Sequence, residues 1–245
     1  ARAIIESCDV FFYKMSIKIG IDLLSKYSKK FGLGQVTGID IHGEQPGIMP
    51  SRSWKKSARG ESWFNGDTIN VSIGQGFMLT TPLQLGVMMA RIASKGKMVK
   101  PQLVKSSNGN PVIGSENTES IGIDAEHLAY IHQAMKAVVH SPRGTARRIN
   151  RDLNYTIAGK TGTAQVISIK AEEEYDSSKI DKSQWDHALF VAFAPVENPQ
   201  IAIGLIVENG EHGSSAAAPI ARLVMDAYMK TKAGSHQSTE SEVLH

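Results

Sequence analysis

Apolar residues recur at three- and four-residue steps in five segments of the chain, and this spacing is typical of amphipathic helices. The first segment corresponds to one helix or a pair of helices. The second has Asp22 as a candidate N-cap and Gly32 just past its end, and in the third Pro82 takes the first helical position. The pattern therefore predicts helices over residues 2–19, 22–31, 82–96, 124–140 and 217–230.

Three further segments are rich in β-branched and aromatic residues and predict strands, at residues 155–168, 187–194 and 200–207. A polar, acidic stretch over residues 170–186 separates the first two, and the sequence Glu197-Asn198-Pro199 turns the second into the third. Such short links favour antiparallel neighbours. We therefore predict an α+β fold, in which a helical block is followed by an antiparallel sheet and then by a helix that crosses the sheet.

Elsewhere the periodic pattern fails. Residues 34–70 alternate Gly, Pro, Trp and basic side chains, and we expect a long surface loop there. Residues 97–123 predict short extended pieces and turns. The polar segment 233–245 predicts a disordered tail, which leaves residues 1–232 for the folded part.

The composition excludes several classes of function but says little about the fold. The 245 residues suffice for one large domain or two small ones, and the net charge of +3 is too small to indicate a nucleic-acid partner. The single cysteine, Cys8, excludes an internal disulfide framework and a cysteine-rich zinc site. No apolar run is long enough to cross a membrane as a helix. The chain begins Ala1-Arg2-Ala3 without Met, and we expect it to be a piece of a longer protein.

The most specific short string is Ala158-Gly159-Lys160-Thr161-Gly162-Thr163-Ala164. One hypothesis is the end of a nucleotide-binding phosphate loop, which would require a glycine at Asn154 and a helix after Lys160. The residues that follow favour a strand instead. The sequence therefore argues against nucleotide binding.

The second hypothesis is the Lys-Thr-Gly strand of serine acyltransferases that act on D-alanyl peptides and β-lactams. A strand that lines a cleft can pair its backbone with an extended peptide. Lys160 would offer positive charge to the substrate carboxylate, Thr161 and Thr163 would offer hydroxyls, and Gly162 would let the ligand approach the backbone closely. The backbone N–H of Thr163 is a candidate oxyanion donor. An edge strand with a solvated lysine remains the alternative for this string taken alone.

Several other strings stand beside it in a fixed order. They are Ser7-Cys8-Asp9-Val10-Phe11-Phe12-Tyr13, Gly38-Ile39-Asp40, Gly66-Asp67-Thr68, Ser72-Ile73-Gly74-Gln75-Gly76, Thr81-Pro82-Leu83-Gln84, Gly144-Thr145-Ala146, residues 187–195 and Ala217-Ala218-Pro219. With these strings, the chain resembles the transpeptidase domain of class B penicillin-binding proteins of the elongation, or rod-shape, type. The resemblance runs from Ala3 to about Lys230.

The resemblance implies site residues. Ser7 and Asp9 fall on the family's S-x-N element, where the serine is thought to pass a proton, and Lys160 falls on the K-[ST]-G strand. Asp9 departs from the commoner Asn, and an Asp there could hydrogen-bond Lys160. The family's nucleophile is the serine of an S-x-x-K element upstream of S-x-N. Literal matches begin at Ser53 and Ser94, but both come after Ser7, so we expect the nucleophile upstream of Ala1.

The resemblance also implies a reaction and a setting. The parent protein would be a peptidoglycan D,D-transpeptidase that cross-links stem peptides through a serine acyl-enzyme and is acylated by β-lactams. No metal or organic cofactor is implied. The expected partners are a RodA-type SEDS polymerase and an MreC-type scaffold. The expected location is the bacterial inner membrane, with the catalytic domain facing the periplasm. A carboxypeptidase or β-lactamase, and a non-catalytic β-lactam or muropeptide sensor, remain open as alternatives.

Overall fold

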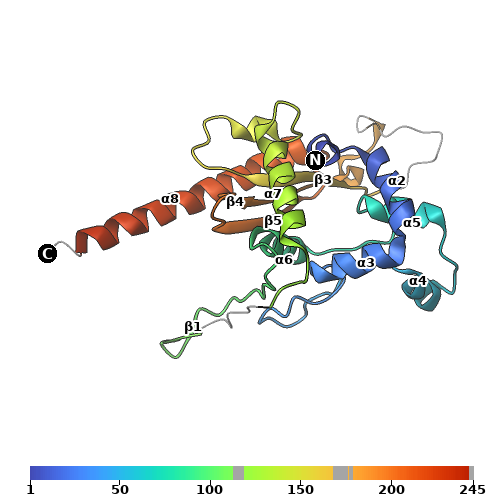
Figure 1. Cartoon of the computed structure of the whole chain (residues 1–245), viewed down its shortest axis with the longest axis horizontal. Helices are drawn as coiled ribbons and strands as arrows, with labels where there is room; N and C mark the ends of the chain where they lie inside the picture. The colour runs from blue at the N-terminus through green and yellow to red at the C-terminus, as the bar shows by residue number, and fades with distance from the viewer. Residues whose placement is uncertain (113–118, 168–175, 177–178, 243–245) are drawn as a thin grey trace.

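The computed structural model describes residues 1–112, 119–167, 176 and 179–242 (Figure 1). Its main sheet has three antiparallel strands in the order β3-β4-β5. Their bounds are β3 (Ala158–Ala164), β4 (His187–Ala194) and β5 (Ile201–Val207). The predicted α+β class and the antiparallel order of neighbouring strands are both confirmed.

The helices precede the sheet, apart from one that follows it. They are α1 (Arg2–Ile5), α2 (Asp9–Ile19), α3 (Ile21–Lys30), α4 (Arg52–Arg59), α5 (Asn65–Ser72), α6 (Pro82–Ala93), α7 (Ala125–His140) and α8 (Ala218–Glu242). Short helical turns occupy η1 (Arg147–Asn150), η3 (Lys182–Gln184) and η4 (Gly213–Ala217). The first predicted helical segment is thus a pair of helices, and α6 and α7 begin after the N-caps Thr81 and Asp124.

The central strand β4 is covered on both faces, because successive side chains of a strand point to opposite sides. On one face, Phe190 and its even-numbered neighbours pack with α7, η4 and α8 around Val138 and Met225. On the other face, Phe193 packs with Met89 of α6. Both phenylalanines are fully buried. An uninterrupted apolar sequence over 187–194 is what a strand buried on two faces requires.

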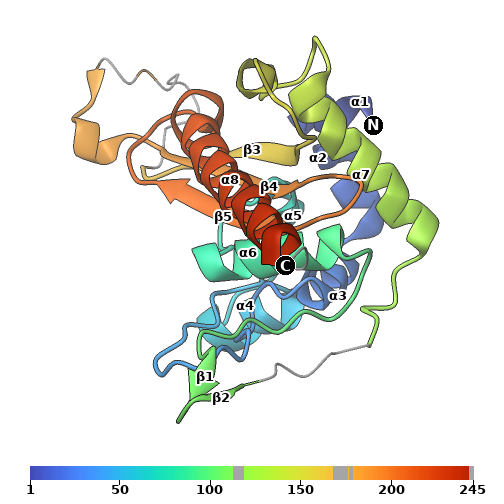
Figure 2. The same ribbon diagram turned by 90° about the vertical axis from the view of Figure 1, so that its left-hand side faces the viewer.

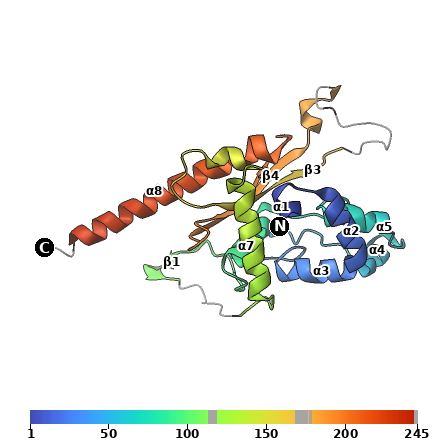
Figure 3. The ribbon, with the colours of Figure 1, turned by 45° about the horizontal axis from the view of Figure 1, so that its top comes forward.

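Helices α2 to α5 form a cluster of their own, at the end of the molecule opposite the C-terminal end of α8 (Figures 1 and 3). Its small core contains Ile21, Met49 and Val71. A two-stranded hairpin, β1 (Ser106–Ser107) and β2 (Asn110–Pro111), extends away from the sheet (Figures 1 and 2). The carboxylate of Asp40 holds its base by accepting hydrogen bonds from two successive backbone N–H groups.

The prediction of a surface loop over residues 34–70 is wrong, because this segment contains α4 and the start of α5. The side chain of Lys55 is only 4% exposed and its ammonium lies 2.7 Å from the Asp67 carboxylate. The aromatic rings of Trp63, Phe64 and Phe77 surround the same ammonium. A helix of eight residues that buries a lysine does not produce an apolar repeat, so the pattern could not reveal it.

Other boundaries move by smaller amounts. Asp22 is not an N-cap but lies in the first turn of α3, where a negative charge complements the helix dipole. The first strand is shorter than predicted and ends at Ala164. Helix α8 continues through most of the polar segment expected to be a tail, and residues 243–245 lie outside the described residues. Residues 170–175, 177 and 178 of the acidic stretch and residues 113–118 of the segment 97–123 also lie outside the described residues.

The Lys55–Asp67 pair gives a test of the packing of α4 against α5. Burial raises the pKa of Asp67, but the hydrogen bonds from Lys55 and from the backbone N–H of Phe64, together with the charge of Lys55, outweigh it, and the pKa lies below its ordinary value. Replacing Asp67 with Asn leaves the buried ammonium without its nearest countercharge. We expect Asp67→Asn to lower the free energy of unfolding by about 3 kcal/mol, as measured by urea denaturation.

The double variant Lys55→Met/Asp67→Asn is the matched control, because it removes both charges and keeps an apolar chain among the rings. It should recover most of the lost stability. Because the folded pKa of Asp67 is depressed, the stability that the pair supplies is present above the unfolded pKa and is lost as the pH falls through the folded pKa. Equal losses in the single and double variants would contradict this account.

Candidate active site

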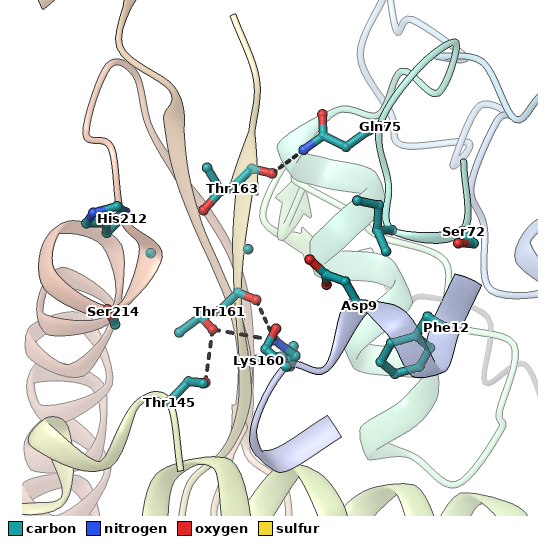
Figure 4. Close-up of a pocket in the computed structure, with 14 residues that line it drawn as sticks. Asp9, Phe12, Ser72, Gln75, Thr145, Lys160, Thr161, Thr163, His212 and Ser214 are labelled. Carbon is teal, nitrogen blue, oxygen red and sulfur yellow. Dashed lines mark hydrogen bonds between the residues drawn. The ribbon is translucent and has the colours of Figure 1, made fainter. Parts of the chain in front are cut away.

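A cavity of about 500 Å³ lies between β3 and the helical cluster (Figure 4). Four parts of the chain form its walls: the turn into α2, the turn that follows α5, the segment after α7, and the edge of β3 with the neighbouring η4. The lining residues are Ser7, Asp9, Phe12, Ser72, Ile73, Gln75, Thr145, Lys160, Thr161, Gly162, Thr163, His212, Gly213 and Ser214. All six site residues expected from the sequence are among them.

Ser7 occupies a turn that ends α1 in the left-handed region, with φ at +54°. The backbone N–H of Ser7 donates to the carbonyl of Ile4, and that of Cys8 donates to the carbonyl of Ala3. This is the Schellman arrangement, in which the left-handed position is usually glycine. The backbone of Ser7 therefore has a conformation that costs about 1 kcal/mol for a residue with a Cβ.

The turn is anchored to the segment that follows α7. Arg143 donates to the carboxylate of Glu6, and the backbone N–H of Thr145 donates to the carbonyl of Ile5. Gly144 makes this approach possible, because a Cβ there would lie 2.1 Å from the carbonyl oxygen of Val138. The position of Ser7 thus depends on close packing against the end of α7.

Lys160 joins the strand to the helical turn. Its ammonium donates to Ser7 Oγ over 2.8 Å, between residues 153 positions apart, and to the backbone carbonyl of Thr161 over 2.9 Å. Burial lowers the pKa of Lys160 to about 8, and the charge of Asp9 opposes part of this shift. A sizeable neutral fraction therefore exists near pH 8, and neutral Lys160 can accept a proton from a hydroxyl.

Asp9 lies in the first turn of α2 and its carboxylate faces the cavity (Figure 4). The expected hydrogen bond between Asp9 and Lys160 is not formed: in the described residues, the Lys160 ammonium donates to Ser7 and Thr161 instead. Asp9 acts on Lys160 through its charge, which raises the pKa of the ammonium. An Asp at this position is therefore not electrically equivalent to the commoner Asn.

The edge of β3 presents backbone groups to the cavity. The carbonyl of Thr161 accepts from Lys160, and the carbonyl of Thr163 accepts from the side-chain amide of Gln75. Because the N–H and C=O of one residue in an antiparallel strand point to the same side, the N–H of Thr163 also points to this edge. It is placed to donate to an oxyanion in the cavity.

Eight of the fourteen lining residues were not singled out as site residues from the sequence, among them Thr145, Gln75 and His212. Thr145 Oγ1 lies 3.0 Å from Thr161 Oγ1, and Gln75 bonds the backbone of β3. Both belong to strings that carry the family resemblance, so that signal was present. His212 has no such signal. It lies before Gly213, where a Cβ would meet the backbone of Gly162 and Leu189, so close packing of η4 on β3 brings it to the cavity.

The two literal S-x-x-K matches lie elsewhere. Ser53 is in α4 and lines a different hollow, with its hydroxyl 2.9 Å from Ser51 Oγ. Ser94 caps the C-terminal end of α6 and donates to the carbonyl of Arg91. Neither lines the cavity that holds Ser7 and Lys160. The string around Lys160 lies within a strand, whereas a phosphate loop would be followed by a helix, so the prediction that it is not a phosphate loop is confirmed.

The geometry matches a known family. Residues 1–226 match the penicillin binding protein transpeptidase domain. The chain belongs to this transpeptidase family. Among curated relatives, the peptidoglycan D,D-transpeptidase MrdA of Haemophilus influenzae is 40% identical over 239 residues, and MrdA of Acinetobacter baumannii is 41% identical over 235. Each alignment covers 94% of this chain but only 36% and 34% of the relative, so the chain spans about a third of their length.

Solved penicillin-binding protein structures agree. PBP2 of Pseudomonas aeruginosa, solved with WCK 5153, is 43% identical and superposes with a TM-score of 0.81 over 92% of this chain and 48% of that one. PBP2 of Helicobacter pylori, solved in complex with MreC, is 33% identical with a TM-score of 0.77 over 93% of this chain and 39% of that one. The resemblance to elongation-type penicillin-binding proteins is confirmed. In the described part of this transpeptidase chain, no helix has the length and apolar character needed to span a membrane.

The left-handed turn gives the first test of this transpeptidase site. Ser7→Ala removes the hydroxyl but keeps the Cβ, whereas Ser7→Gly removes both. We expect Ser7→Gly to be about 1 kcal/mol more stable than Ser7→Ala in chemical denaturation, because only glycine relieves the backbone cost. Equal stabilities would show that the turn is not strained.

The charge of Asp9 gives the second test. In Asp9→Asn the opposing charge disappears, so the midpoint of Lys160 should fall below about 8 in an NMR titration of labelled lysine side chains. Asp22→Asn is the control, because Asp22 also lies in a first helical turn but pairs with Arg52. A Lys160 midpoint that rises or stays fixed in Asp9→Asn would contradict the electrostatic role of Asp9.

Proposed function

We propose that the protein to which this chain belongs is a serine peptidoglycan D,D-transpeptidase of the elongation type, and a target of β-lactams. The observation that carries this proposal is the 2.8 Å hydrogen bond from Lys160 to Ser7, beside the edge strand β3 in a chain of the transpeptidase family. The relatives named peptidoglycan D,D-transpeptidase support the reaction type.

In the proposed reaction, a serine hydroxyl from outside this chain attacks the carbonyl of the penultimate D-alanine of a stem peptide. A new ester bond forms and the C–N bond to the terminal D-alanine breaks. The proton of the nucleophile passes to the leaving amine, and Ser7 and Lys160 form the relay because their hydrogen bond lies at the cavity. An amine of a second stem peptide then takes the acyl group and the serine recovers its proton.

Other residues of this chain hold the substrate in the proposed site. The N–H of Thr163 stabilises the oxyanion that forms during attack. The hydroxyls of Thr161 and Thr163 donate hydrogen bonds to the terminal carboxylate of the stem peptide. The positive charge on protonated Lys160 also attracts this carboxylate. Thr145 keeps the Thr161 hydroxyl in place through the 3.0 Å contact between their oxygens. No step in this scheme uses a metal or an organic cofactor.

The setting is proposed on the same grounds. The reaction requires peptidoglycan, so the catalytic domain would face the periplasm from the bacterial inner membrane. The MreC complex of the Helicobacter pylori relative supports an MreC-type scaffold as a partner. A relative that is 31% identical, with a TM-score of 0.74, comes from a peptidoglycan synthase complex that coordinates polymerization and crosslinking, which supports a RodA-type SEDS polymerase as a second partner.

The test compares this chain with a longer protein that includes the upstream part expected to carry the nucleophile. Each is incubated with a fluorescent penicillin, and covalent label is read on a denaturing gel. We expect label on the longer protein only, with a loss of at least a hundredfold in labelling rate for Lys160→Ala, because the relay and the carboxylate contact are both removed.

Lys136→Ala is the control, since Lys136 forms an exposed ion pair with Glu197 away from the cavity. Label on the short chain would place the nucleophile within it and overturn the rejection of Ser53 and Ser94. Absence of label from both proteins would favour a non-catalytic sensor. Release of the acyl group to water alone, with no transfer to an amine, would favour the carboxypeptidase or β-lactamase alternative.

A further inference from the structure

The strand edge at the cavity is already occupied by a side chain. Gln75 Nε2 donates to the carbonyl of Thr163 over 2.8 Å (Figure 4). Gln75 Oε1 accepts from the N–H of Gln165 over 3.3 Å. A single amide thus supplies one donor and one acceptor to residues two apart, Thr163 within β3 and Gln165 one residue past its end. Neighbouring strands in a parallel ladder make the same pair of bonds. The Gln75 side chain therefore imitates a strand residue.

Gln75 reaches this edge from a turn and not from a strand. Its backbone N–H donates to the carbonyl of Asn70, and glycines with positive φ stand on both sides, Gly74 at +80° and Gly76 at +70°. The base of the turn is fixed by α5, which the Lys55–Asp67 pair holds against α4. The amide can therefore leave the edge by rotation of its own side chain, without movement of the helices.

An extended acyl donor needs the group that Gln75 now uses. If the reacting carbonyl of the donor accepts from the N–H of Thr163 and the donor runs antiparallel to β3, the two residues form a hydrogen-bonded pair. Residues of such a pair exchange both of their bonds. The N–H of the donor residue that carries the reacting carbonyl is then directed at the carbonyl of Thr163, which accepts from Gln75 Nε2.

We infer that Gln75 is a specificity-determining residue, which selects acyl donors whose own amide N–H displaces it from the Thr163 carbonyl. The inference rests on the proposed function. Stem peptides and penicillins with an acylamino group carry this N–H next to the reacting carbonyl. Carbapenems lack it, because they have a hydroxyethyl group instead. Gln75 therefore competes with the first class of ligand and not with the second.

The experiment measures second-order acylation rates of the longer protein with benzylpenicillin and with a carbapenem. Removing the competing amide in Gln75→Ala should raise the benzylpenicillin rate about fivefold relative to the carbapenem rate, which is the worth of one neutral hydrogen bond. Gln75→Glu should also raise the benzylpenicillin rate relative to the carbapenem rate, since a carboxylate cannot donate to the Thr163 carbonyl and is repelled by it.

Gln102→Ala is the matched control, because Gln102 also donates to two backbone carbonyls, those of Val104 and Val112 in the distant hairpin. It should leave the ratio of the two rates unchanged. Equal changes with both ligands in the Gln75 variants, or a selective fall with benzylpenicillin, would show that Gln75 only supports the wall and would overturn the inference.

A second readout does not depend on variants. The side-chain amide protons of Gln75 should exchange slowly with solvent in the free protein and at least tenfold faster after acylation by benzylpenicillin, but not after acylation by the carbapenem. Unchanged exchange after both reactions would also overturn the inference. If the wild-type protein reacts with neither ligand, the proposed function itself fails, and this outcome is distinct from a reaction that ignores Gln75.

Discussion

The partial burial of one lysine ammonium, that of Lys160, constrains the arrangement of the site. Lys160 lies at the junction of the sheet and the helical cluster, and burial in this position would be costly without hydrogen-bond partners. The hydroxyl of Ser7 and the carbonyl of Thr161 supply them. The two halves of the molecule thus meet around a polar contact, and their separation would leave the ammonium and the strained serine turn without their partner.

The sequence predicts the parts of this arrangement that depend on local pattern. Helices α6 and α7 and the three strands follow from periodicity, and Pro82 marks the start of α6. Ser7 and Lys160 come from a family resemblance, since no property of an isolated sequence brings together residues 153 positions apart. Local pattern can define the elements, but only tertiary packing shows which of them meet.

The remaining residues were missed for identifiable reasons. The short helices α4 and α5 are stabilised by a buried ion pair within aromatic rings, which in a sequence looks like a basic loop. The role of Gln75 depends on the direction of one side chain relative to a strand edge, and His212 reaches the cavity only because η4 packs closely on β3. Such contacts depend on distances that spacing along the chain does not encode.

The burial of β4 on both faces also fixes the register of this strand against its neighbours. Lys160 pairs with Val191, and the even and odd residues of β4 fit different helices on the two faces of the sheet. A slip of β4 by one residue would exchange these faces and is therefore excluded. Side chains of such a strand therefore have little freedom to change. The turns around the cavity differ in this respect, because their side chains can change while the strand keeps its register.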